Sequence, residues 1–337
     1  MVEVPTLKLV CERKICDLMP CHRPTERWEA SGVLVRDRHY FVVFDDRTEI
    51  ARIADNLQPD DTNGLFGMSH ADYGYEGITY NAAKQRFYLL VEARKHTTGC
   101  YKASIVEYDD DFRYLKDRPV DFTFEHSNKG FEAVVHVRRN NEDYLLALCE
   151  GNKCKGGDKG RKPGGGRVLL FEKKKKRWLH SRTVALPRSL PFVDYSGMSL
   201  DSGRVAIVSQ VNSMLWVGHL DEADWTWHNE GQLYEFPRSN NGAIQYGNIE
   251  GVGWITSKRI VTVSDKRKKR ISQTRNFRKK INRSTFLKFA HSAVWRGGGA
   301  GPRIGSPQTA RSRSTIVRHP EYPPNLGCYT HSWLRKD

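Results

Sequence analysis

Five pairs of short, strand-like segments repeat along this chain, and this repetition constrains the fold more than any other feature. In the clearest repeat, an apolar segment at 75–80 is followed by a second at 86–92 across a polar turn. Each first segment begins near a small residue, and successive small residues lie between 45 and 64 residues apart in the sequence. The five small residues are Gly32, Gly77, Ala133, Gly197 and Gly251. Periods near 40 to 50 residues built of four short strands are typical of a β-propeller.

We therefore predict an all-β fold, a β-propeller of five four-stranded blades. Six blades are the alternative, if the loop at 55–73 or the C-terminal segment contains the strands of another blade. The segment 6–15 alternates apolar and polar residues and precedes the first repeat, so we expect it to complete the last blade and close the ring. A small residue at the start of each first strand suits a place where backbones approach closely, as they do around a propeller axis.

Further strands are expected around the repeats, with loops between them. We expect a Lys/Gly-rich loop at 152–166 to be a mobile surface loop. Asp109, Asp110 and Asp111 are expected to form a turn, with a calcium site as the less favoured alternative. The additional strands are expected at 49–54, 104–108, 120–124, 167–171, 178–186, 214–220, 232–236 and 286–290.

The net charge of +16 is confined to the C-terminal segment. Residues 266–337 contain 18 Lys and Arg but only two acidic residues, so residues 1–265 are electrically neutral. We predict a propeller domain over 1–270 and a basic, disordered tail rich in Arg, Ser and Gly over 271–337. Such a tail could contact nucleic acid through 266–283. A mis-predicted exon or a shifted reading frame would also explain its composition.

The cysteines and the hydropathy suggest a cytoplasmic protein. Seven cysteines, an odd number in a large chain, argue against a disulfide framework and for a reducing compartment. The spacing of Cys11, Cys16 and Cys21 differs from that of usual zinc sites. No run approaches about 18 apolar residues, so we expect no membrane span. The charged N-terminus does not resemble a secretory signal.

Acidic residues recur at the same place in most repeats. The start of a first strand and the end of the second lie at the same end of an antiparallel pair. If the first strands line the axis, two sets of mostly acidic side chains face one mouth of the channel. The first set is Glu76, Glu132 and Glu250, and the second is Asp45 or Asp46, Glu92, Glu150 and Asp265, with Gln210 in the fourth repeat.

So many carboxylates repel one another unless a cation neutralises them. A hard cation such as Ca²⁺ takes six to eight oxygen ligands and could activate water or polarise an ester. The metal candidates are therefore Glu76, Glu132, Glu250, Asp46, Glu92, Glu150 and Asp265, and the candidates for substrate binding are Arg94, His96 and His136. The structural alternative is that each Glu accepts backbone hydrogen bonds from the next blade.

The recurring Glu-Gly-Ile/Val opening, followed by a strand that ends in an acidic residue, resembles phytase-like and esterase-like β-propellers. The wider group is the calcium-dependent phosphotriesterase-like superfamily. The resemblance covers about residues 6–265 and implies a metal-dependent hydrolase. Two features depart from that group: Ser196 and Gln210 replace acids in the fourth repeat, and there are five repeats instead of six.

Two functions from different classes follow from these observations. The first is a Ca²⁺-dependent hydrolase acting on a small phosphoester, ester or lactone at the acidic mouth. The second is a non-catalytic propeller scaffold that binds a protein or a small ligand on its loop face. A metal requirement with saturable ester hydrolysis would distinguish the first from the second.

Overall fold

The structure, a computed structural model, describes residues 3–20, 28–68, 73–95, 99–125, 129–265 and 285–290. These residues are almost entirely β-strands and turns, so the predicted all-β class is confirmed. They belong to one compact unit, Met1–Ala293. Among them, no helix has the length and the apolar character that crossing a membrane requires. His96 and the segment 266–283 lie outside the described residues, as does the predicted tail apart from 285–290.

Each of the five repeats forms an antiparallel hairpin, as predicted. The second strands are buried along almost their whole length because other strands cover both of their faces. The hairpins are β2 (Ala30–Arg36) with β3 (His39–Phe44), β6 (Gly77–Asn81) with β7 (Arg86–Lys95), β10 (Phe131–Arg139) with β11 (Glu142–Cys149), β14 (Gly197–Asp201) with β15 (Arg204–Ser209), and β19 (Ile249–Thr256) with β20 (Arg259–Ser264).

Further strands extend each hairpin outward. They are β4 (Arg47–Ala54), β5 (Gly64–Phe66), β8 (Tyr101–Asp109), β9 (Tyr114–Asp121), β12 (Arg167–Lys173), β13 (Trp178–Ala185), β16 (Met214–Asp221), β17 (Thr226–Trp227), β18 (Gln232–Glu235) and β21 (Thr285–Ala290). Two expectations were wrong in detail. The loop predicted at 55–73 contains β5, and the strand predicted at 120–124 is β9, which starts six residues earlier.

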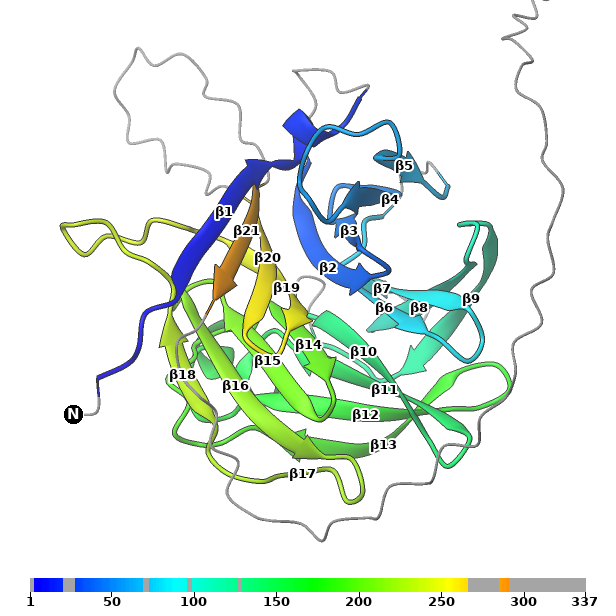
Figure 1. Ribbon diagram of the computed structural model, residues 1–337. Helices are drawn as coiled ribbons and strands as arrows, with labels where there is room; N and C mark the ends of the chain where they lie inside the picture. The colour runs from blue at the N-terminus through cyan, green and yellow to red at the C-terminus, as the bar shows by residue number, and fades with distance from the viewer. Residues whose placement is uncertain are drawn as a thin grey trace, which may run out of the picture. The chain divides into compact units, whose positions relative to one another are not determined.

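The five first strands contact one another in cyclic order, β2 to β6, β10, β14, β19 and back to β2 (Figure 1). Their small residues permit this approach. A Cβ on Gly77 would lie 3.0 Å from the backbone nitrogen of Val134, and one on Gly251 would lie 2.9 Å from the Cα of Gly32. The close backbone approach that the repeated small residues predicted is therefore present.

The N-terminal strand β1 (Lys8–Lys14) pairs with β21, which pairs with β20. The sheet order is β1-β21-β20-β19 (Figure 1). Strand β21 was expected from its apolar pattern, and it lies within the segment that composition alone assigned to the tail. The hairpin of β19 and β20 is thus extended by β21, which follows it in the sequence, and by β1, which precedes it.

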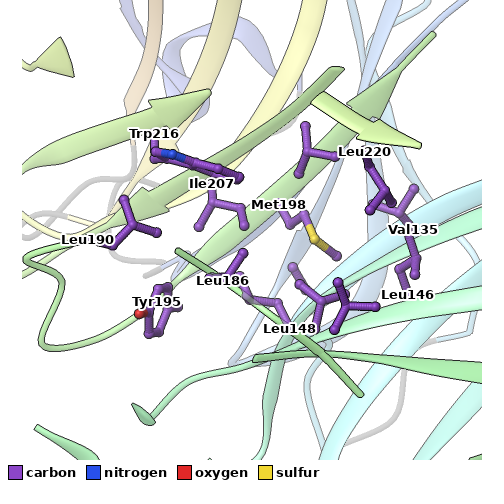
Figure 2. Close-up of a cluster of buried hydrophobic side chains, with 14 of the residues drawn as sticks. Val135, Leu146, Leu148, Leu186, Leu190, Tyr195, Met198, Ile207, Trp216 and Leu220 are labelled. Atoms are coloured by element: carbon purple, nitrogen blue, oxygen red, sulfur yellow. The ribbon is translucent and has the colours of Figure 1, made fainter. Parts of the chain in front are cut away.

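The hydrophobic core lies between neighbouring sheets. Figure 2 shows one cluster in which Val135 and Leu146 of one sheet pack with Met198, Ile207 and Trp216 of the next. Trp216 and Ile207 are completely buried. Burying such side chains contributes about 1.5–3 kcal/mol each. A short parallel pairing of β13 with β9 joins the sheet of β10–β13 to the sheet of β6–β9, giving one sheet of eight strands.

The loop at 152–166 lies at the surface, as expected, with most of its residues exposed or half-buried, and a few buried residues anchor it. It contains η2 (Asn152–Cys154) and α1 (Gly157–Gly160). The buried Asn152 amide donates to the carbonyls of Gly160 and Phe192. A disulfide joins Cys149 to Cys154, five residues apart. One such local bond is not a disulfide framework. The cytoplasmic location of the protein stays a prediction.

Candidate metal centre

Glutamates from two hairpins converge at one end of the first strands. Glu132 opens β10, Glu150 follows β11, and Glu92 lies near the end of β7. One carboxylate oxygen from each of the three glutamates lies within 4.8 Å of the other two. All three side chains are half-buried. The antiparallel rule that predicted this meeting therefore holds for these residues.

Burial and mutual repulsion keep these carboxyls protonated to higher pH than usual. Burial, followed by the charges of Glu76 and Glu150, raises the pKa of Glu132 well above its usual value. Burial and the charges of Asp45 and Glu92 do the same for the pKa of Glu76. The ionised forms are thus costly, and a bound cation would remove that cost.

A lysine enters the cluster from the loop before β10. The Nζ of Lys129 forms an ion pair with Glu150, whose side chain is only 15% exposed. Burial raises the pKa of Glu150, and Lys129 partly offsets this. Burial and the charge of Glu150 raise the pKa of Glu92 to about 7, although its carboxylate accepts a hydrogen bond from the Gly130 backbone at 3.0 Å.

Glu250 and Asp265 bring the fifth repeat to the same region. Burial and the charges of Asp265 and Asp45 raise the pKa of Glu250 well above its usual value. Asp46 lies differently. Its carboxylate accepts a hydrogen bond from the Glu29 backbone at 3.0 Å, because the chain turns immediately after β3 ends. Asp45, not Asp46, is the residue of this turn whose charge acts on the glutamates.

Serines, not glutamates, connect neighbouring sheets at the strand starts. Ser196 donates its hydroxyl to the Ile249 carbonyl at 2.7 Å, and Ser31 donates to the Tyr75 carbonyl in the same way. Across the described ranges, the carboxylates of Glu76, Glu132 and Glu250 accept no hydrogen bond. The structural alternative for the repeated glutamates thus lacks the contacts that it requires.

The expected substrate-binding residues do not gather at this cluster. His136 lies four residues beyond Glu132, about 13 Å along the strand. Its Nε2 lies 3.2 Å from Asp143, at the start of β11 and thus at the other end of the hairpin. Arg94 stacks on Tyr73, 3.6 Å from the ring centre, and its Nη1 lies 3.7 Å from Asp117 on β9.

Sequence reasoning missed Lys129 and Asp194, and it chose Asp46 instead of Asp45 as the metal candidate of the first repeat. Asp194 is buried, and its charge acts on Glu150. A usable signal existed for Lys129. The pairing of Phe131 with Cys149 places the residues just before β10 beside those just after β11, which include Glu150. No comparable pattern marks Asp194, which lies in an irregular segment.

The donor set fits a hard cation. Calcium–oxygen distances of about 2.3–2.6 Å place two ligand oxygens of one ion at most about 5 Å apart. The three glutamates meet that condition. Carboxylates that bind through both oxygens would supply up to six ligands, and Glu76 and Asp45 lie close enough to act on the cluster electrostatically. Carboxylates without His or Cys favour calcium or magnesium over zinc.

Comparisons with known proteins add little. No family model matches the sequence, and no curated protein matches it. Among solved structures, the chain is similar to Myxococcus xanthus glutaminyl cyclase at 12% identity and a TM-score of 0.45, covering 86% of this chain and 99% of that one. It is similar to a Dos1 propeller at 8% identity and a TM-score of 0.40, covering 70% and 52%. It is also similar to RS223-Beta-xylosidase at 9% identity and a TM-score of 0.48, covering 82% and 94%.

Proposed function

We propose that the protein is a five-bladed β-propeller, closed by β1, that holds a divalent cation at its central carboxylates and hydrolyses a small ester, phosphoester or lactone there. The cyclic contacts of the five first strands and the pairing of β1 with β21 support the blade count and the closure. The phytase-like and esterase-like resemblance supports the reaction class. We propose Ca²⁺ as the cation.

One observation carries the proposal of a cation site. Oxygens of Glu92, Glu132 and Glu150 lie within 4.8 Å of one another, and the Glu132 carboxylate accepts no hydrogen bond within the described residues. Lys129 supplies one positive charge against at least three carboxyl groups. Ionising these carboxyls together without a cation opposes folding, so an ion-binding role explains the cluster better than a structural role.

The residues around the cluster suit hydrolysis. A calcium ion, when bound, would polarise an ester oxygen and lower the pKa of water. The ammonium of Lys129, held beside Glu150, can stabilise negative charge that develops on the substrate.

The test is a calcium titration of the full chain by calorimetry at pH 8. We expect stoichiometric binding that Glu132→Gln abolishes while the protein stays folded. The matched control is Glu142→Gln, an exposed glutamate on the next strand at the other end of the same hairpin, and it should bind calcium normally. A screen of carboxyl esters, phosphoesters and lactones with and without calcium then tests catalysis.

Each outcome decides one part of the proposal. No calcium or magnesium binding by the folded protein would overturn the cation site. Binding without metal-dependent hydrolysis would overturn the enzymatic part and leave a metal-stabilised scaffold for a protein or small ligand. Hydrolysis that persists in chelator and in Glu132→Gln would place the reaction elsewhere.

A further inference from the structure

A second polar site lies on the outer part of the sheet that contains β7, β8 and β9, separate from the glutamate cluster. It is a cavity of about 320 Å³, within the range of small-molecule pockets. Its lining residues include four cationic side chains, Arg94, Lys95, Lys102 and Arg177, and two carboxylates, Asp117 and Asp121. The cavity therefore carries an excess of positive charge, unlike the glutamate cluster.

Two cations of this cavity face each other across neighbouring strands. Arg94 on β7 is paired directly with Lys102 on β8. Like charges in directly opposed positions of an antiparallel pair are destabilising. In the described part of the chain, Lys95 and Lys102 form no ion pair. The contacts of Arg94 with Asp117 and of Arg177 with Asp121 are long, at 3.7 and 3.8 Å.

Arg94 packs on an aromatic ring. Its Cζ lies 3.6 Å from the centre of the Tyr73 ring. Nη1 faces Asp117, whereas Nε and Nη2 are buried without a hydrogen-bond partner in the described chain. These two atoms form the side of the guanidinium that binds an oxyanion through two parallel hydrogen bonds. Buried charged donors without an acceptor are costly.

A hydroxyl donor completes the set. Ser104 lies two residues from Lys102 on β8, so both side chains project from the same face of the sheet. Ser104 also lines the cavity, and its hydroxyl is buried without a partner in the described residues. The cavity thus offers an arginine, a lysine and a serine hydroxyl as donors. Together they match the oxygens of a tetrahedral oxyanion better than the two oxygens of a carboxylate.

We propose that this cavity, which we call the Arg94 cavity, binds a phosphate group, and that its volume leaves room for a small organic substituent on that phosphate. The guanidinium of Arg94, the ammonium of Lys102 and the hydroxyl of Ser104 donate to the phosphate oxygens. Lys95 and Arg177 attract the anion at the rim. The proposal is independent of the metal centre, because no residue of the glutamate cluster lines this cavity.

The test is calorimetric titration of the full chain with inorganic phosphate at 150 mM NaCl, with acetate as a second titrant. We expect saturable phosphate binding that Arg94→Gln weakens at least tenfold and Lys102→Gln weakens several-fold. The control is Arg113→Gln, an arginine on the β8–β9 turn that is 74% exposed and lies outside the cavity. That variant should bind phosphate as the wild type does.

Three results would overturn the proposal. The first is no saturable phosphate binding by the wild type. The second is equal phosphate affinity in wild type, Arg94→Gln and Lys102→Gln. The third is acetate binding as tight as phosphate binding, which would mark a general anion surface. If Arg94→Gln does not fold, Lys102→Gln and Ser104→Ala, whose side chains are small or partly exposed, decide between these results.

Discussion

Replacing Glu92 by glutamine separates the charge of this residue from its hydrogen bond. The Glu92 carboxylate accepts a hydrogen bond from the Gly130 backbone at 3.0 Å, and an amide oxygen can accept the same bond. The substitution therefore removes a negative charge from the crowded cluster with little change in shape. In the absence of metal, we expect Glu92→Gln to stabilise the protein.

The size of the effect follows from the pKa of Glu92, which rises from its usual 4.5 to about 7. Each tenfold step in acidity corresponds to about 1.4 kcal/mol, so ionised Glu92 destabilises the folded state by about 3 kcal/mol. The folded state binds the proton more tightly than the unfolded state. The destabilisation is therefore absent below pH 4.5, grows as the pH rises to 7, and is complete above 7.

The assay is urea unfolding followed by tryptophan fluorescence, in chelator, at pH 8 and at pH 4.5. The variant should be more stable than wild type by up to about 3 kcal/mol at pH 8 and about equal to it at pH 4.5. Calcium should reverse the order at pH 8, because the variant lacks one ligand. A variant that is less stable than wild type at pH 8 in chelator would refute the electrostatic reasoning.

Three further predictions test other parts of the structure. Glu107, which is 0% exposed, lies 2.6 Å from Arg118 Nε and 3.2 Å from Lys173 Nζ, so Glu107→Gln should cost about 3–5 kcal/mol in urea unfolding at pH 7. Burial raises the pKa of Glu107, but Lys173 and Arg118 outweigh it and lower the pKa, so its contribution should disappear as the pH falls below 4.5. An unchanged stability would contradict this. Calcium at one hundred times its Kd should add about 2.7 kcal/mol, or roughly 5–10 °C in Tm by scanning calorimetry at pH 8, and much less at pH 5, where the glutamates are protonated. An equal shift at both pH values would argue against carboxylate ligands. Gly251→Ala should cost about 1–3 kcal/mol, because the new Cβ would lie 2.7 Å from Val263 Cγ2 and 2.8 Å from the Val33 nitrogen. The exposed Ser257→Ala in the same hairpin is its control, and equal effects of the two would refute the crowding argument.

The hairpins could be predicted from the sequence because their signal is local. Alternating apolar residues and a small opening residue mark all five, and the antiparallel rule then places Glu132 near Glu150. Strand β9 was poorly predicted, because Tyr114–Asp121 contains four charged residues and a proline. Its packing depends on partners that a local pattern does not reveal.

The position of the Arg94 side chain could not be predicted either, and the reason is related. In a regular strand, Arg94 would share a face with Glu92, two residues earlier. The pairing of β7 with β8 shifts register between Val91 and Arg94, and this irregularity directs Arg94 away from the glutamates. The same limit applies to Asp45 and Asp46, where a turn decides which carboxylate reaches the cluster.

The pairing of β1 with β21 has a consequence for synthesis of the protein on the ribosome. The partner of Lys8 is Ala290, so about 280 residues must be translated before the two strands can meet. At about 5–20 residues per second, β1 waits for tens of seconds with its backbone donors and acceptors unpaired. During that interval β1 can bind a chaperone or pair with a neighbouring nascent chain. The yield of folded protein should therefore depend on translation speed and on chaperone supply more than its final stability suggests.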